Sequence, residues 1–260
     1  MTTTYTSYRQ IAKDMTRSIE LVAKEPLVER DTEYYLANIG NIKSIDAFMA
    51  DTRIFNYAMK AHGLEDMTYA KAFIRKALTE GIDDDGAFAK QLTDTRYSAF
   101  VETFNFARHG GTATVFTKAQ QGTVDKYMRQ TLEEEAGQDN TGVRLALYFE
   151  RNAPSVTSAY GILADTALYD VVRTALGLPA EFANSNIDRQ ADFINSKLDL
   201  ADFTDPEKLS KFIERFTALW ELENPSAGTI DVTQLFTSSY DQGISADLLM
   251  SINSLKLGGR

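Results

Sequence analysis

One stretch of the chain occurs twice, and this internal repeat limits the possible folds more than any other feature. The first copy spans Arg30–Leu64 and the second spans Arg144–Leu178. An offset of 114 positions aligns the copies without a gap and makes ten of 35 positions identical. Ordinary residue frequencies would give about two identities by chance. The identical pairs are Arg30/Arg144, Tyr34/Tyr148, Asn38/Asn152, Ser44/Ser158, Ala50/Ala164, Asp51/Asp165, Thr52/Thr166, Ala61/Ala175, Gly63/Gly177 and Leu64/Leu178. The repeat predicts two related lobes.

The repeated stretch has the residue pattern of short, capped α-helices. Ser44 and Asp51 each precede an apolar run and are residue types that favour the N-cap position. Gly63 follows the second run, where a glycine can adopt the left-handed conformation that ends a helix. No stretch of the chain shows the period-two alternation of a half-buried strand. The sequence therefore predicts an all-α fold with two related helical lobes from an internal duplication, plus N-terminal, central and C-terminal helices.

The predicted organisation assigns each of five segments to one part of that fold. They are an N-terminal tail and helix (1–24), lobe 1 (25–112), a connecting helix (113–138), lobe 2 (139–228, the repeat of lobe 1), and a C-terminal segment and helix (229–260). Residues 1–7 are small and polar, which predicts a disordered tail before one helix that continues to about residue 24. Thr68 is the predicted cap of a further helix in lobe 1. The last predicted helix, Ile244 to Leu257, carries an apolar stripe.

Composition excludes several classes of function. The chain has 260 residues and a net charge of −10, and an acidic surface repels the phosphate backbone of nucleic acids. The absence of cysteine removes disulfides, thiolate metal sites and cysteine nucleophiles. No segment has the roughly 20 apolar residues that cross a bilayer, and the N-terminus does not resemble a signal peptide. We therefore expect a soluble protein with no nucleic-acid partner, no membrane insertion and no cleaved signal.

Two acidic clusters invite a metal-binding interpretation. Asp83–Asp85 followed by Gly86 resembles part of a calcium-binding EF-hand loop, but positions 1 and 12 would be Gly81 and Leu92, which are not ligands. Acidic residues that begin a helix explain this cluster. Glu133–Glu135 are consecutive, so they point in different directions around a helix, and no histidine follows at dimetal-site spacing. We interpret this second cluster as a solvent-facing surface and predict no metal site.

The two histidines do not form a catalytic pattern. His62 precedes the helix-ending Gly63, where a cation would interact favourably with the helix dipole. His109 precedes Gly110–Gly111 and is expected in a turn. Neither has a nearby serine and acid that would indicate a catalytic triad, and no phosphate-binding glycine motif is present. The prediction is that the chain contains no catalytic, cofactor-binding or metal-binding residue.

The pairs Asp51–Thr52 and Asp165–Thr166 are the most distinctive repeated polar feature. One interpretation makes them twin ligand sites. The other makes each aspartate the cap of a helix, repeated because the backbone turn is repeated, and the strong preference of Asp for caps favours it. The adjacent Tyr34–Tyr35 and Tyr148–Phe149 are expected as core aromatics whose hydroxyls reach water.

Residues 33–81, EYYLANIGNIKSIDAFMADTRIFNYAMKAHGLEDMTYAKAFIRKALTEG, resemble the family labelled domain of unknown function 1217. Residues 99–106 (AFVETFNF) and 243–259 (GISADLLMSINSLKLGG) are similar to it as well. The resemblance implies an all-helical fold and genes that are often found inside flagellar and motility clusters of alphaproteobacteria. It implies no catalytic residues, and a link through gene neighbourhood concerns association rather than chemistry.

Two functions of different classes remain open. The first is a non-enzymatic helical protein of the bacterial flagellum or motility system that acts through protein contacts, in an assembly, regulatory or structural role. We expect it in the cytoplasm, with flagellum association or export through the flagellar channel as the alternative. The second is an enzyme or small-molecule-binding protein with a site in the cleft between the lobes, a favoured position for ligands. The sequence leaves the partner and the oligomeric state open.

Overall fold

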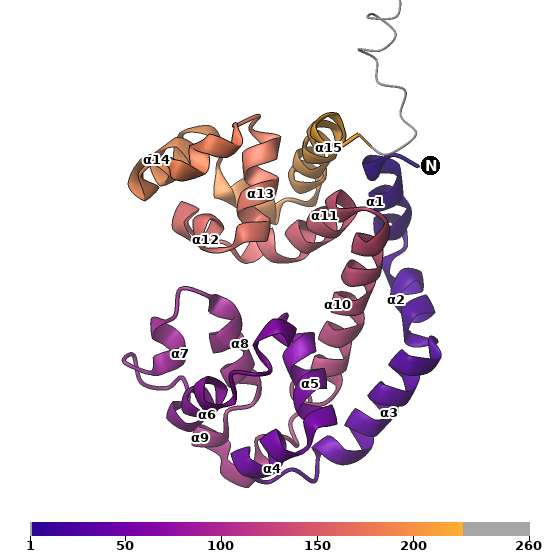
Figure 1. Cartoon of the computed structure of the whole chain (residues 1–260), viewed down its shortest axis with the longest axis vertical. Coiled ribbons are helices and arrows are strands. Elements are labelled where there is room, and N and C mark those ends of the chain that lie inside the picture. Colours follow the sequence, from indigo (N-terminus) through magenta and orange to yellow (C-terminus); the bar gives the residue numbers. More distant parts are fainter. Residues whose placement is uncertain (1, 226–260) are drawn as a thin grey trace, which may run out of the picture.

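The computed structural model describes residues 2–225, and this part of the chain is helical without any strand (Figure 1). The predicted all-α fold is confirmed. The predicted C-terminal helix, Ile244 to Leu257, lies outside the described residues. Within residues 2–225, no helix combines the length and the apolar composition that spanning a membrane requires.

Short helices connected by 3₁₀ turns make up the described chain. Before the central helix lie α1 (Thr4–Lys13), α2 (Met15–Ala23), α3 (Pro26–Ile39), α4 (Ile45–Ala50), α5 (Thr52–Ala61), α6 (Lys71–Glu80), α7 (Phe88–Gln91), α8 (Thr95–Thr103) and α9 (Phe106–His109). The central helix and those after it are α10 (Gln121–Asp139), α11 (Thr141–Asn152), α12 (Ala159–Ala164), α13 (Thr166–Ala175), α14 (Ile187–Lys197) and α15 (Pro206–Glu223). The 3₁₀ turns are η1 (Glu65–Met67), η2 (Gly110–Thr112), η3 (Ala153–Ser155), η4 (Ala180–Asn184) and η5 (Leu200–Thr204).

The helices gather around two hydrophobic cores, and we call the helices around each core a lobe. Lobe 1 surrounds a cluster of buried aromatic rings that includes Phe48, Phe55 and Phe100. Lobe 2, built from α11 to α15, surrounds a second cluster that includes Phe149 and Phe216. Helix α10 contributes apolar side chains to the first core and packs on both α5 and α11, so it forms the spine between the lobes (Figure 1).

The first three helices form a strap that runs along both lobes (Figure 1). Helix α1 packs on α11 and α15 of lobe 2, α2 packs on α10, and α3 packs on α5 of lobe 1. The sequence predicted one helix up to about residue 24, but Asp14 ends α1 and its side chain caps α2 by accepting from the Arg17 N–H. The strap therefore bends at Asp14, and this bend lets its two ends reach different lobes.

The prediction of a disordered tail over residues 1–7 was wrong, because α1 begins at Thr4. The Thr4 backbone N–H donates to the Glu221 carboxylate at 3.0 Å, and the Asn140 amide donates to the Thr4 hydroxyl at 2.9 Å. Gly142 lets this junction close, since a Cβ there would lie 2.4 Å from Cδ1 of Trp220. The N-terminus is thus held by residues that are distant in the sequence.

The two copies of the repeated stretch make the same local contacts. Asp51 and Asp165 are the N-caps of α5 and α13, as predicted, and accept from backbone N–H groups of the first turn. Gly63 and Gly177 both have φ of +68°, the left-handed conformation expected after each helix. The predicted cap at Thr68 was wrong, because α6 begins at Lys71. Descent of the two lobes from one duplicated ancestor stays a prediction.

Candidate functional site between the lobes

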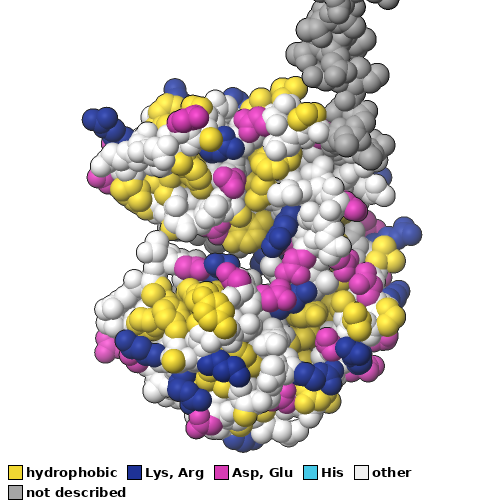
Figure 2. All heavy atoms as spheres, in the orientation of Figure 1, with side chains coloured by type: hydrophobic (Ala, Val, Ile, Leu, Met, Phe, Trp, Pro, Cys, Tyr) yellow, Lys and Arg dark blue, Asp and Glu magenta, His cyan; other side chains and the backbone are white. Residues whose placement is uncertain are grey.

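A cavity of about 390 Å³ lies between the two lobes, where the surface is visibly hollowed (Figure 2). Lobe 1 contributes the end of α5 and the start of α8, α10 forms the back, and lobe 2 contributes α11, α12 and the start of α13. Its lining residues are Gly63, Thr93, Asp94, Thr95, Arg96, Gln130, Thr141, Arg144, Leu145, Tyr148, Gly161, Ala164, Asp165, Thr166 and Ala167. We call this cavity the inter-lobe cleft. It is the place where the sequence analysis put the alternative, small-molecule site.

Asp94 and Arg96 form the lobe 1 wall of the cleft. Asp94 caps α8 by accepting from the Arg96 backbone N–H, and it also binds the Arg96 guanidinium through Nε at 3.0 Å and Nη2 at 2.7 Å. Hydrogen bonding to Asp94 is the largest cause that raises the pKa of Arg96 above its ordinary value. The same guanidinium donates to the Gly63 carbonyl, which ties the start of α8 to the end of α5. Arg96 is therefore held in place by the chain itself.

Tyr148 and Asp165 form the opposite wall. The Tyr148 hydroxyl donates to the Asp165 carboxylate at 2.6 Å, and the backbone N–H groups of α13 donate to the same carboxylate. Burial, followed by the Asp165 charge, raises the pKa of Tyr148. Lobe 1 contains the same pair, because the Tyr34 hydroxyl donates to Asp51 at 2.9 Å. Of the two repeated aspartates, Asp165 lines the cleft and Asp51 does not. The repeated aspartates therefore do not form one shared ligand site.

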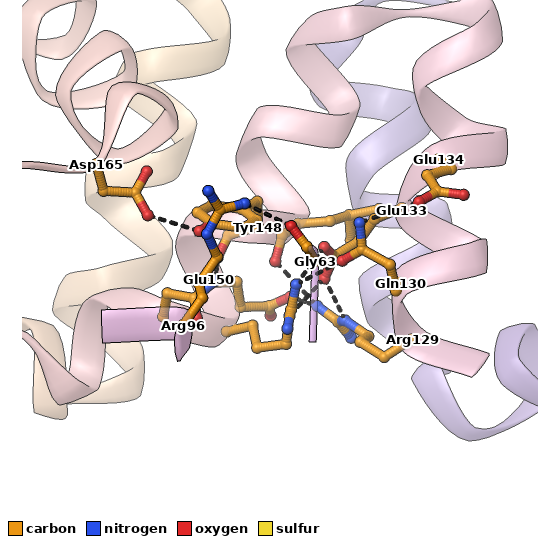
Figure 3. Close-up of polar contacts among 12 residues, drawn as sticks. Gly63, Arg96, Arg129, Gln130, Glu133, Glu134, Tyr148, Glu150 and Asp165 are labelled. Carbon is orange, nitrogen blue, oxygen red and sulfur yellow. Dashed lines mark hydrogen bonds and ion pairs between the residues drawn. The ribbon is translucent and has the colours of Figure 1, made fainter. Parts of the chain in front are cut away.

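A charged network at the back of the cleft contradicts the sequence interpretation of Glu133 as a solvent-facing residue. The Glu133 side chain is only 1% exposed and accepts from Arg129 Nε at 3.0 Å (Figure 3). Arg151 on α11 binds the same carboxylate through Nε at 2.8 Å and Nη2 at 2.7 Å. The prediction failed because α11 folds back along α10 and covers this face, which the sequence around Glu133 does not reveal. We call Arg129, Glu133 and Arg151 the joint network.

The joint network extends to the neighbouring helices. Arg129 donates to the Leu147 carbonyl at 3.1 Å and to Glu150 at 3.3 Å, both on α11 (Figure 3). Arg151 also donates to the Gln130 side chain at 3.2 Å, and Gln130 in turn lines the cleft. The network therefore connects the spine helix with lobe 2 directly behind the cavity.

His62 is not the cation that its position at a helix end suggested. Its ring is buried in lobe 1, edge-on to Phe100 with 5.3 Å between ring centroids. Burial is the largest cause that lowers the pKa of His62 to about 3. His62 is therefore neutral at physiological pH. The other histidine, His109, ends α9, and its ring lies tilted against Phe116 with 4.7 Å between ring centroids.

The acidic residues Asp83–Asp85 have contacts within the chain. Asp83 binds Arg108, Asp84 accepts from the Gly86 N–H, and Asp85 binds Lys90 at 3.0 Å. Across residues 2–225, no group of three or more histidine or acidic side chains is arranged to hold a metal ion.

Comparisons with known proteins place the chain in a family. The family model described as "Protein of unknown function (DUF1217)" matches residues 61–209. The chain belongs to this family. The DUF1217 chain is also similar to a crystal structure of the protein AGR_C_984 from Agrobacterium tumefaciens, with 54% sequence identity and a TM-score of 0.80. The match covers 85% of this chain and 94% of the Agrobacterium chain. No curated protein matches.

Of the polar residues that line the cleft, Tyr148, Asp165 and Thr166 were singled out from the sequence, whereas Asp94, Arg96 and Gln130 were not. Arg144 is the most distinctive of them, because its guanidinium is exposed and has no ion-pair or hydrogen-bond partner among residues 2–225. It was visible in the sequence only as an identity with Arg30 in the repeat. Arg30, by contrast, pairs with Asp31 at 3.4 Å. In the sequence this difference is visible at the next position, where Asp31 follows Arg30 but Leu145 follows Arg144. The missing acidic neighbour was the signal that could have identified Arg144.

Proposed function

We propose that this DUF1217 protein is a non-enzymatic helical protein that acts in bacterial motility through contacts with other proteins. The observation that carries the proposal is that the carboxylates of the cleft already bind groups of the same chain. Asp94 and Asp165 cap helices and bind Arg96 and Tyr148 of the same chain. A general acid or base needs access to a substrate proton, and carboxylates committed to helix caps are poorly placed for that role.

The motility part of the proposal rests on the family resemblance. Genes of this family are often found in flagellar and motility clusters, which is an association of neighbourhood. We place the protein in the cytoplasm, with export through the flagellar channel as the alternative. Immunoblots of culture supernatants from a wild-type and an export-deficient strain distinguish the two locations, because only an exported protein would disappear from the supernatant of the second strain.

Deletion of the gene tests the proposed function. We expect the deletion strain to swim poorly on soft agar, to grow at the wild-type rate, and to recover swimming when the wild-type gene is supplied. Capture of the tagged protein from the complemented strain should then enrich components of the motility system. Normal swimming combined with a growth defect on particular nutrients would contradict the proposal and favour a metabolic role.

A second candidate function is binding of a small molecule in the inter-lobe cleft. The observation that favours it is the Arg144 guanidinium, which has no ion-pair partner among residues 2–225 and lines a cavity of about 390 Å³, a volume within the range of ligand pockets. Arg144→Gln is a clean test, because the side chain is exposed and its replacement breaks no ion pair among residues 2–225. If ligand binding is the function, this variant should fold normally and fail to restore the deletion strain. Restored swimming would favour the protein-contact function.

A further inference from the structure

Lys126 on the spine helix α10 faces His62 of lobe 1, a histidine whose protonation state is fixed by its surroundings. His62 Nδ1 lies 2.9 Å from the Ala58 carbonyl oxygen, which can only accept, so Nδ1 carries the ring proton. The other nitrogen, Nε2, therefore presents a lone pair. Lys126 Nζ lies 3.0 Å from this Nε2, so the lysine is the donor in this hydrogen bond.

Thr103 supplies the second acceptor for Lys126. Its hydroxyl donates to the Ala99 carbonyl at 2.9 Å. The hydroxyl oxygen also lies 3.1 Å from His62 Nε2, and with its proton on Ala99 it accepts from Lys126 Nζ at 3.4 Å, as Nε2 does at 3.0 Å. A neutral amine has two N–H groups, and these two acceptors match them. Both acceptors are uncharged, so neither compensates the positive charge of an ammonium group.

The charges around Lys126 also favour its neutral form. No acidic side chain among residues 2–225 binds this amine, and its charged neighbours are cations. Partial burial is the largest cause that lowers the pKa of Lys126, followed by the charges of Arg151 and Lys118. Arg151 is bound to Glu133, and Lys118 pairs with Glu102 at 2.9 Å. The two flanking cations would attract a small anionic reagent to this amine.

We propose that Lys126 is a covalent modification site, at which the uncharged amine attacks the carbonyl carbon of a small acyl phosphate. The nitrogen lone pair forms the new N–C bond, and the C–O bond to phosphate breaks with its electron pair remaining on the phosphate oxygen. One amine proton passes to solvent, and the product is an amide on Lys126. Arg151 and Lys118 favour this class of donor because the leaving phosphate is anionic.

Acetylation of the folded protein with acetyl phosphate at pH 7 tests the proposal. The extent of modification at each lysine is followed over time by peptide mass spectrometry, with the exposed Lys24 as the internal reference. A lower pKa raises the neutral fraction of an amine at pH 7, so we expect Lys126 to react faster than Lys24. The preference should disappear in urea, where the contacts with His62 and Thr103 are lost.

The variant Lys118→Gln tests the role of the flanking charge without touching His62 or Thr103. We expect slower acetylation of Lys126 by acetyl phosphate and an unchanged rate at Lys24. The uncharged donor acetic anhydride should show a smaller effect of the same variant. Equal rates at Lys126 and Lys24 in the folded protein would overturn the modification site. Equal effects of Lys118→Gln with both donors would overturn the preference for acyl phosphates.

Discussion

The substitution Glu133→Gln should destabilise the protein strongly, because it removes the only carboxylate that both arginines of the joint network bind among residues 2–225. Glu133 accepts three charge-assisted hydrogen bonds, from Arg129 Nε and from Nε and Nη2 of Arg151. Removing one member of a buried ion pair costs about 3–5 kcal/mol, since the remaining charge stays buried. The Arg151 side chain is 29% exposed and can regain some water, so we expect a cost near the lower end, about 3 kcal/mol.

Urea unfolding followed by far-UV circular dichroism measures this cost. With a slope of about 3 kcal/mol per molar urea, the upper value for small proteins, the midpoint should fall by about 1 M. The matched control is Glu102→Gln, which removes the same charge from an exposed pair with Lys118 and should cost no more than about 1 kcal/mol. If Glu133→Gln and Glu102→Gln unfold at the same urea concentration, the buried network does not have the role assigned to it.

Three further predictions use the same unfolding assay. Gly142→Ala should destabilise by about 1–3 kcal/mol because its Cβ would overlap Trp220, whereas Gly161→Ala places its nearest contact at an ordinary 3.5 Å and should be neutral or stabilising. Asp51→Ala should cost about 0.5–2 kcal/mol through loss of the α5 cap, and an unchanged midpoint would contradict the cap. The pKa of His62 is lower in the folded protein than in the unfolded chain. The free energy of unfolding should therefore be undiminished by this histidine above about pH 6.5, and should decrease as the pH falls towards about 3, by up to about 1.4 kcal/mol per pH unit. His62→Leu should flatten that part of the pH profile, and an unchanged profile would refute the assignment.

The features that were predictable from the sequence depend on neighbouring residues. Asp51 and Asp165 were identified as caps because a cap binds backbone groups two or three residues away. Gly63 was identified for the same reason, since the turn after a helix needs a left-handed residue there. These local rules, repeated along the chain, were sufficient to predict an all-α fold.

The features that escaped prediction depend on residues far apart in the sequence. Thr4 looked like part of a flexible tail, yet it is held by Glu221, which lies 217 positions later. Glu133 looked solvent-facing because its own neighbours are acidic, and its burial depends on Arg151 from the next helix. Asp14 combines local and distant causes. Its residue type favours a cap, which the sequence shows, but α1 and α2 also pack on different helices, which the sequence does not show.

The joint network bears on how the cleft is maintained. Buried ion pairs often add little net stability compared with apolar residues, but an incorrect arrangement that separates the partners is strongly disfavoured. Arg129 and Glu133 lie on α10, and Arg151 lies on α11, so their pairing holds these two helices against each other. The relative position of the two helices sets the distance between the lobes, because α10 packs on lobe 1 and α11 belongs to lobe 2. Our hypothesis is that the network fixes the width of the cleft. Small-angle X-ray scattering would show a changed radius of gyration for folded Glu133→Gln and none for Glu102→Gln, and identical profiles would rule the hypothesis out.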